Sequence, residues 1–407
     1  MIWANLFHIY QPPNWDPKII NKVATESYRP LISILKKNPQ VNITININAS
    51  LTEQLIEHQL DDVVKGFRDL AEKGQVEFTG SAKYHTILPL ISRQEIKRQI
   101  QLNTEVNKKY FGPVYEPVGF FPPEMCYSFK ISETIKELGF KWIALDEISF
   151  GGQLGQVSLD QRYQMSNGMT AIFRNRYISD YFAFSAPINK PQEFIAKIGK
   201  DDRSGSYLVT AMDGENLGHH RIGTDRLWEA AITNYKTVTF SDYLKRLKKT
   251  EVVNPLRASW SSRPEDIQAG SPYVLWYNHD NTIHMLQWPL TYLISHLVHQ
   301  AEAQDDKDAG DAHGLLDAAL ASDQYWWASA QPWWSKEIVI RETKELLDVI
   351  KDLKTVSDTD RKQAHNLYDM IIREVERWQS EGIAQERAEE YRQRTQETKY
   401  MGGKKVI

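Results

Sequence analysis

The chain has 407 residues and a single cysteine, Cys126. One thiol excludes both an internal disulfide and a zinc site built from cysteines. An excess of charge of one sign is lacking as well, because 49 Lys and Arg residues face 53 Asp and Glu residues, a formal net charge of −4. A protein this close to neutrality has no global electrostatic basis for binding nucleic acid, and we expect no nucleic-acid partner.

Long apolar runs are also missing. No stretch approaches the roughly 18 to 20 apolar residues that a membrane-spanning helix needs. The first residues, MIWANLFHIYQPP, lack the basic region, the apolar run and the small-residue cleavage site of a secretory signal. We therefore expect a cytoplasmic protein without a membrane partner, and the sequence leaves its oligomeric state open.

Aromatic residues, in contrast, are abundant, with 12 Trp and 19 Tyr. Most such rings fill a large core, but flat ring faces also stack on sugars in carbohydrate-binding clefts. Hydrophobic residues make up 41% of the chain and charged residues 25%, which are the proportions of a globular protein. The length fits two or three domains, or one large barrel with an additional domain.

Through about residue 255, short β-rich runs alternate with helical segments, a pattern typical of a parallel α/β fold. In VNITININAS (residues 41–50), apolar and polar residues alternate with period two, so the polar set should share one face and line a wet barrel interior. Seven strands are predicted, over residues 2–10, 41–49, 76–82, 118–121, 142–146, 170–174 and 207–212.

Several helix ends can be read between these strands. Ser50 with Glu53 predicts a capping box that opens one helix, which Gly74 should end. Ser92 with Glu95 predicts a second capping box, which opens another helix. A further helix starts near residue 129, and Gly139 should end it.

Strand signals fade after about residue 270. The pattern there predicts an exposed loop over 301–314, a frayed tail over the last six residues, and helices over 280–300, 312–330, 335–354 and 358–394. We therefore predict a barrel domain over 1–260 and an α-helical domain over 261–407.

Acidic and histidine side chains collect where the predicted strands end. They are His8 after the first strand, Glu124 after the fourth, Asp146 and Glu147 after the fifth, and Asp213 and Glu215 after the seventh. In parallel α/β barrels the carboxyl ends of the strands are where sites are built. The placement of these side chains at one end of the strands favours an active site at the mouth of the barrel.

Five short segments carry residues suited to such a site. They are HIYQP at 8–12, GSAKYHTILPL at 80–90, GFFPPE at 119–124, DGENLGH at 213–219 and SDQYWW at 322–327. Each has a simpler structural explanation, such as a strand-to-helix turn, a Glu at a helix N-terminus or aromatic core packing. Two prolines before a carboxylate nevertheless give it the stiff backbone that suits a reacting group. The acidic and histidine residues of the fourth segment do not match the His-Glu-x-x-His zinc spacing.

The order of these five segments resembles glycoside hydrolase family 57, and the resemblance extends over residues 8–327. It implies an incomplete (β/α)7 TIM-like barrel followed by a C-terminal α-helical bundle that completes the substrate cleft. It also implies retaining hydrolysis or transfer on α-linked glucans, α-1,4 foremost, by an α-amylase or a 4-α-glucanotransferase, with no metal or other cofactor.

When the family's functional residues are carried over by position, the resemblance implies that Glu124 is the nucleophile and Asp213 is the general acid/base. A retaining double displacement needs two carboxyl groups about 5 to 5.5 Å apart, one ionised and one protonated. Asp213 should therefore have a raised pKa, from burial or from the charge of Glu124. The residues that would contact the sugar, or orient those that do, are His8, Gln11, His85, Phe121, Glu215, His219, Asp323 and Trp326.

Three departures from the family pattern border the expected substrate. In the fifth segment, Gln324-Tyr325-Trp326-Trp327 replaces the family's common variants. Tyr10 stands where the family usually has a second histidine, and Phe121 stands where it usually has a tryptophan, which removes an indole donor. These changes affect the prediction of the substrate more than the predictions of the fold and of the carboxylate pair.

Two other functions stay open from the sequence. A metal-dependent hydrolase, like an α-mannosidase or a polysaccharide deacetylase, would use His8, His85, Asp213 and His219 as ligands and would lose activity to a chelator. A non-catalytic glucan-binding or regulatory protein on the same fold would bind glucan without turnover.

Overall fold

The computed structural model describes residues 1–199 and 206–401, with side chains described up to residue 394 apart from the gap. The chain divides into two compact units, Met1–Gln268 and Ala269–Ile407. The tail predicted for the last six residues lies outside the described part.

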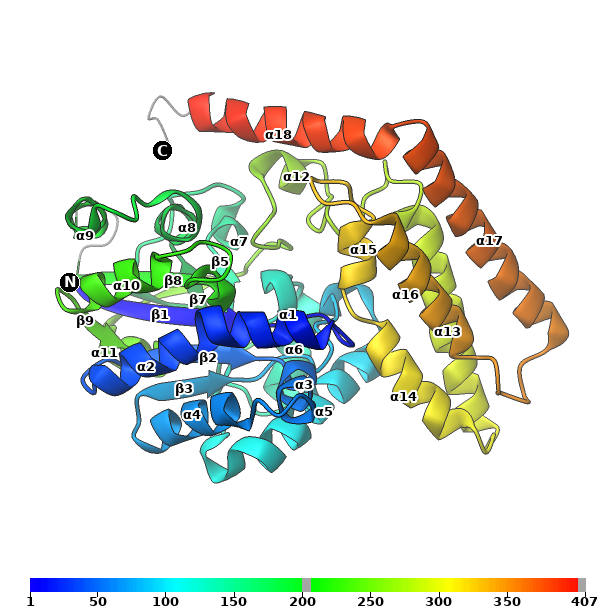
Figure 1. The fold of residues 1–407 in the computed structure, drawn as a ribbon, viewed down its shortest axis with the longest axis horizontal. Coiled ribbons are helices and arrows are strands. Elements are labelled where there is room, and N and C mark those ends of the chain that lie inside the picture. Colours follow the sequence, from blue (N-terminus) through cyan, green and yellow to red (C-terminus); the bar gives the residue numbers. More distant parts are fainter. Residues whose placement is uncertain (200–205, 402–407) are drawn as a thin grey trace. The chain divides into compact units, whose positions relative to one another are not determined.

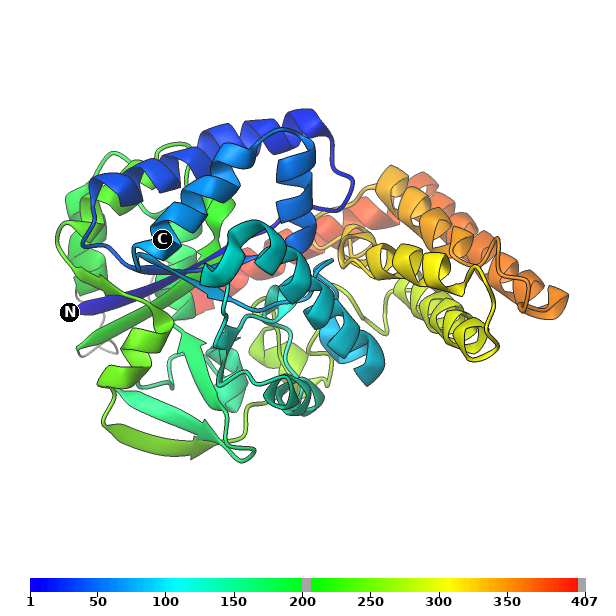
Figure 2. The same ribbon diagram turned by 90° about the horizontal axis from the view of Figure 1, so that it is seen from below.

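The first unit is built on two mainly parallel sheets. In the first sheet the central strand β1 is buried from Trp3 to Ile9, and β9 (Lys236–Val238) pairs with its beginning. The order of the other strands is β3-β2-β1-β8, with β1 at Ile2–Ile9, β2 at Ile43–Ile47, β3 at Val76–Thr79 and β8 at Tyr207–Asp213. Figure 1 shows helices α2 (Arg29–Lys37) and α4 (Asp61–Glu72) beside these strands, and Figure 2 shows α2 again on one side of β1.

The second sheet has the order β10-β6-β7-β5-β4. Its strands are β10 (Lys249–Val253), β6 (Gln161–Met165), β7 (Thr170–Arg174), β5 (Trp142–Asp146) and β4 (Gly119–Phe120). Every pair is parallel except β6 with β7. Strands β6, β9 and β10 were not predicted, because they are short or polar and lack a clear apolar alternation.

Backbone hydrogen bonds connect both edges of the first sheet to the second sheet. Gly80 N donates to Gly119 O over 2.8 Å, Phe121 N donates to Gly80 O over 2.9 Å, and Asn175 N donates to Val209 O over 2.8 Å. Within the described part of the first unit, the strands therefore follow the ring order β8-β1-β2-β3-β4-β5-β7. These are the seven predicted strands, and the incomplete (β/α)7 barrel is confirmed.

The polar face of β2 is present, but its environment differs from the prediction. Thr44, Asn46 and Asn48 are fully buried, and they bond to protein groups. Thr44 donates to Glu77, and the Asn46 amide donates to the Thr79 hydroxyl over 3.0 Å. The polar side chains thus form a hydrogen-bonded network inside the barrel, because a ring this small brings facing polar groups within bonding distance.

One predicted helix start is wrong and another is confirmed. The helix expected to be capped by Ser50 is α3 (Ala49–Glu57), whose N-cap is Asn48, two residues earlier. It is separate from α4 because Gln59 between them has a left-handed φ of 60°. Ser92 caps α5 as predicted, accepting from Glu95 N. The other helices of this unit are α1 (Pro17–Val23), α5 (Arg93–Phe111), α6 (Phe129–Glu137), α7 (Ile148–Gly151), α8 (Arg176–Asp180), α9 (Pro191–Gly199), α10 (Thr224–Ile232), α11 (Phe240–Arg246) and α12 (Pro264–Gln268).

The second unit is helical in its described part. Its helices are α13 (His284–Ala303), α14 (Ala309–Ala319), α15 (Asp323–Trp327), α16 (Lys336–Asp348), α17 (Asp358–Ser380) and α18 (Ile383–Met401).

Three boundaries in this unit differ from the prediction. The predicted loop over 301–314 is too long, because an Ala-rich segment within it forms the start of α14. The predicted helix over 312–330 is two helices, α14 and α15, and the one over 358–394 is broken at Gly382, whose φ is 76°. Among the described residues, no helix has the length and apolar character needed to span a membrane.

Candidate active site

A stack of four flat side chains lies at the carboxyl end of β1, β3 and β4. The ring centres of His8 and His85 are 4.9 Å apart, those of His85 and Tyr10 are 4.0 Å apart, and those of His8 and Phe121 are 4.8 Å apart, with the planes within 18° of parallel. His8 Nε2 lies 3.0 Å from His85 Nε2, and His8 Nδ1 lies 2.7 Å from Asn46 Oδ1. The sequence-predicted residues His8, His85 and Phe121 are therefore brought together.

Burial keeps these two histidines neutral. It lowers the pKa of His8 to about 4, against the opposing effect of Asn46, and it holds the pKa of His85 well below its usual range, with His8 adding to the shift. A neutral imidazole offers one N–H donor and one acceptor nitrogen, so the pair can orient polar groups at neutral pH.

The Glu124 carboxylate stands next to this stack on a strained turn. Glu124 follows Pro122 and Pro123, and its φ of 58° and ψ of 18° are in the left-handed region that side chains disfavour. Such a conformation costs roughly 1 to 3 kcal/mol and persists where the surroundings hold it. Glu124 Oε1 lies 3.8 Å from His85 Nε2, and the side chain is 19% exposed.

Trp260 holds Glu124 by two hydrogen bonds. Its indole Nε1 donates to Glu124 Oε2 over 2.6 Å, and its backbone N donates to the Glu124 carbonyl over 3.0 Å. The indole ring also stands edge-on to Phe121, with centres 5.8 Å apart. Sequence reasoning missed Trp260, because it lies after the last barrel strand in a segment with no strand or helix pattern.

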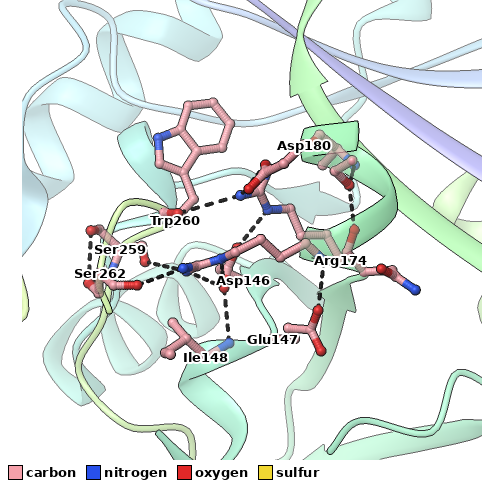
Figure 3. A network of polar contacts seen from close by, with 12 residues as sticks. Asp146, Glu147, Ile148, Arg174, Asp180, Ser259, Trp260 and Ser262 are labelled. Atoms are coloured by element: carbon pink, nitrogen blue, oxygen red, sulfur yellow. Dashed lines mark hydrogen bonds and ion pairs between the residues drawn. The ribbon is translucent and has the colours of Figure 1, made fainter. Parts of the chain in front are cut away.

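A buried ion-pair network lies behind Trp260 (Figure 3). Asp146, at the end of β5, accepts from Arg174 Nε over 2.6 Å and from Arg176 Nη2 over 2.5 Å. Burial alone would raise the pKa of Asp146, but the guanidinium groups of Arg176 and Arg174 hold it below its usual value. The network therefore contains an ionised carboxylate between two cations.

The same two arginines fix the segment that carries Trp260. Arg176 donates to the Ser262 carbonyl over 2.6 Å, and the Arg174 guanidinium lies over the Trp260 ring, 5.3 Å from its centre. Arg174 also donates to the Ala211 carbonyl in β8 over 2.9 Å. The ends of β5, β7 and β8 and the Trp260 segment are thus held in one arrangement.

Asp213 ends β8 directly beside His8, its partner in the β1–β8 register. Burial raises the pKa of Asp213 to about 6; Arg174 opposes this shift, and Asp180 adds to it. The predicted rise is present, and the contributing negative charge is that of Asp180 rather than Glu124. A carboxyl group with this pKa can hold or release a proton near neutral pH.

Glu215 lies two residues further on, in a cluster with Gln11 and Tyr28. Its Oε1 accepts from the Tyr28 hydroxyl over 2.5 Å, from Tyr10 N over 3.2 Å and from Gln11 Nε2 over 3.4 Å. Burial, with Asp213 adding to it, raises the pKa of Glu215 to about 8. The shift favours the protonated form of Glu215 near neutral pH.

The remaining predicted site residues, His219, Asp323 and Trp326, have contacts within their own units. His219 Nδ1 pairs with Glu26 Oε2 over 2.7 Å. Asp323 and Trp326 belong to α15 of the second unit, where the Trp326 ring centre is 5.0 Å from that of Trp327. Within residues 1–199 and 206–401, His8, His85, Asp213 and His219 do not converge as a three-ligand cluster. Their placement does not fit the metal-dependent alternative.

The fold and the site together define a class: an incomplete (β/α)7 barrel whose mouth carries a fixed carboxylate and a second carboxyl group with a raised pKa. The sequence model of Glycosyl hydrolase family 57 matches residues 4–264. The chain belongs to this family.

Curated relatives agree with this assignment. An alpha-amylase of Pyrococcus horikoshii is 27% identical over 232 residues, which are 54% of this chain and 35% of that protein. A putative alpha-amylase of Methanocaldococcus jannaschii is 25% identical over 285 residues, 65% of this chain and 60% of that protein. The chain thus spans less than two thirds of the length of these relatives.

Solved structures share the fold. A 4-alpha-glucanotransferase from Thermococcus litoralis has a TM-score of 0.64 at 19% identity, covering 88% of this chain and 60% of that one. A GH57-type branching enzyme from Pyrococcus horikoshii has a TM-score of 0.70 at 16% identity, covering 90% of this chain and 94% of that one.

Proposed function

We propose that the chain is a retaining glycoside hydrolase or transglycosylase acting on α-linked glucans, with α-1,4 linkages foremost. The observation that carries the proposal is the difference between two carboxyl groups at the barrel mouth. Glu124 accepts an indole hydrogen bond, which favours its ionised form. Asp213 has a pKa of about 6, which suits a proton donor. A two-carboxyl glycosidase mechanism requires this combination, whether configuration is retained or inverted, and the resemblance to the family supports retention.

In the proposed reaction Glu124 is the nucleophile and Asp213 is the general acid/base. A Glu124 oxygen attacks the anomeric carbon, and the bond from that carbon to the leaving oxygen breaks while Asp213 gives that oxygen a proton. Asp213 then removes a proton from water or from a sugar hydroxyl, which attacks the anomeric carbon and releases Glu124. Water gives hydrolysis, and a sugar hydroxyl gives transfer.

The surrounding residues have supporting roles in this proposal. The neutral His8, whose two ring nitrogens bond Asn46 and His85, would orient His85 toward a sugar hydroxyl without adding charge. Glu215, bonded to Tyr28, would set the position of the loop that follows Asp213. Asp323 and Trp326 stay sequence-based predictions of substrate contacts.

The chain lengths of the products test the function. We expect the enzyme to convert maltooligosaccharides of defined length, with the anomeric configuration retained in the first products. Products longer than the substrate would establish transfer, and only shorter products would establish hydrolysis. Tight glucan binding without turnover would instead establish the glucan-binding alternative, and inversion of configuration would contradict the mechanism.

Trp260 provides a separate test of the proposed nucleophile. Trp260→Phe keeps a ring but removes the donor to Glu124. Because a hydrogen bond to a charged group contributes about 1.5 to 3 kcal/mol, kcat should fall roughly 10- to 100-fold. The acid limb of the pH–rate profile should also move to higher pH, since the ionised form of Glu124 loses a donor.

The control for this change is Trp142→Phe, which removes an indole donor to Ser241 at the beginning of β5, away from the mouth. It should leave the acid limb in place. An unchanged acid limb in Trp260→Phe would contradict the role of the indole.

A further inference from the structure

Helices α13 and α14 form a hairpin in the second unit, and they lie side by side in both views (Figures 1 and 2). The connection between them, residues 304–308, is held by Asp306. Its Oδ2 accepts from Lys354 N over 2.7 Å, from Thr355 N over 2.9 Å and from the Thr355 hydroxyl over 3.0 Å. His299 and His313 lie at equal distances along the chain before and after Asp306, so the hairpin brings them to the same level.

Glu302 lies between the two histidines. His299 and Glu302 are three residues apart on α13 and share a helix face. Glu302 Oε2 lies 3.3 Å from His299 Nδ1, and Glu302 Oε1 lies 2.5 Å from His313 Nδ1. One ligand atom from each residue lies within 4.8 Å of the other two.

One ligand pair of this cluster already has the separation that a tetrahedral metal ion requires. Zinc binds histidine nitrogen and carboxylate oxygen at about 2.0 to 2.2 Å. Two such ligands at a tetrahedral ion are then roughly 3.3 Å to 3.5 Å apart, which is the separation between His299 Nδ1 and Glu302 Oε2. Glu302 Oε1 and His313 Nδ1, which are 2.5 Å apart, would have to separate by roughly 0.8 to 1.0 Å to coordinate the same ion.

We propose that His299, Glu302 and His313 form a divalent metal site, with Zn²⁺ as the fitting ion. Two imidazoles with one carboxylate are a borderline-soft donor set that suits zinc. His313 is buried, while the side chains of His299 and Glu302 are 24% and 35% exposed, so the site has a closed wall and an open side for entry. A water molecule would complete the coordination on that side.

A neighbouring carboxylate is consistent with His313 as a metal ligand. An oxygen of Asp317, one turn further along α14, lies within 4.8 Å of a ring nitrogen of His313. In metal sites a carboxylate that accepts from the second ring nitrogen fixes the ring orientation and increases ligand basicity, and Asp317 is near enough to take this role after a small side-chain movement. The ion would join the two helices of the hairpin, and the inference is independent of the reaction proposed for the barrel.

Direct metal binding by the full chain tests the site. The protein is freed of metal with a chelator and titrated with Zn²⁺ by calorimetry, and with Co²⁺ by visible absorption. We expect one ion per chain, a Co²⁺ spectrum of tetrahedral intensity, and a Tm raised by at least about 2 °C at a hundredfold excess of Zn²⁺ over its Kd. His313→Gln and Glu302→Gln should each weaken Zn²⁺ binding at least tenfold.

The matched control is His296→Gln, one turn before His299 on the exposed side of α13. It should keep wild-type Zn²⁺ affinity and stoichiometry. Glu302→Gln keeps the proposal testable if His313→Gln fails to fold, because Glu302 is partly exposed. Absence of saturable binding by the wild-type chain, or equal binding by the wild type and Glu302→Gln, would overturn the site and show that these residues form ion pairs only.

Discussion

Glu124→Gln is expected to lower kcat on maltooligosaccharides by roughly 10⁴-fold or more, because an amide is not a nucleophile toward the anomeric carbon. Asp213→Asn should lower kcat by roughly 10²- to 10⁴-fold, the contribution typical of a general acid/base. Steady-state kinetics on one maltooligosaccharide, with products separated by chromatography, measures both effects. KM should change much less than kcat, since both groups act on the reacting bond.

The control for these variants is Glu77→Gln, which makes the same chemical change on β3 where the carboxylate bonds Thr44 and Ser241. It should retain most of the activity. If Glu124→Gln turned over substrate at the wild-type rate, the Glu124 carboxylate would not be the nucleophile.

The pH dependence gives an independent check on Asp213. A general acid must be protonated to act, so activity that depends on Asp213 is present below its pKa and is lost as the pH rises through it. With a pKa of about 6, kcat/KM of the wild type should decline on the alkaline side from about pH 6 upward. Asp213→Asn should lack this limb, and an identical limb in the variant would assign it to another group.

Asp146→Asn is expected to lower the free energy of unfolding by about 3 to 5 kcal/mol. The amide keeps the shape of the side chain but removes the anion that both buried guanidinium groups share, and it leaves Arg174 with Asp180 at 3.4 Å as a carboxylate partner. Chemical denaturation at pH 7, followed by circular dichroism, measures the change. Activity should fall as well, because Arg174 packs on Trp260.

Asp62→Asn is the matched control, since Asp62 pairs with Arg29 through two hydrogen bonds of 2.7 and 2.9 Å on the surface. An exposed pair contributes about 1 kcal/mol or less. Equal destabilisation by the two variants would mean that burial does not set the strength of the Asp146 network.

The stability that Asp146 provides also has a defined pH range. Its pKa is depressed in the folded protein, so its contribution is complete above the unfolded pKa, about 3.9, and is lost as the pH falls through the lower folded value. Asp146→Asn should therefore approach the wild type in stability only in strong acid.

The sequence by itself determined the parts of this protein that depend on local pattern. Apolar runs and period-two alternation located the seven barrel strands, and the ordered segments located Glu124 and Asp213 at strand ends. Ser92 predicted the beginning of α5 because a helix cap is a contact between residues three apart. The helix over 358–394 was predicted as one because a single glycine, Gly382, is a weak stop signal.

The tertiary structure alone decided what surrounds the carboxyl groups. Trp260 is 136 residues from Glu124, and Arg174 is 28 residues from Asp146, so their contacts leave no periodic trace in the sequence. The pKa of Asp213 follows from burial, which packing creates, and from Asp180 and Arg174 on other elements. Residue types near strand ends can identify candidate groups. Their protonation and orientation depend on neighbours that only the folded chain brings within a few ångströms, where electrostatic interactions are strong.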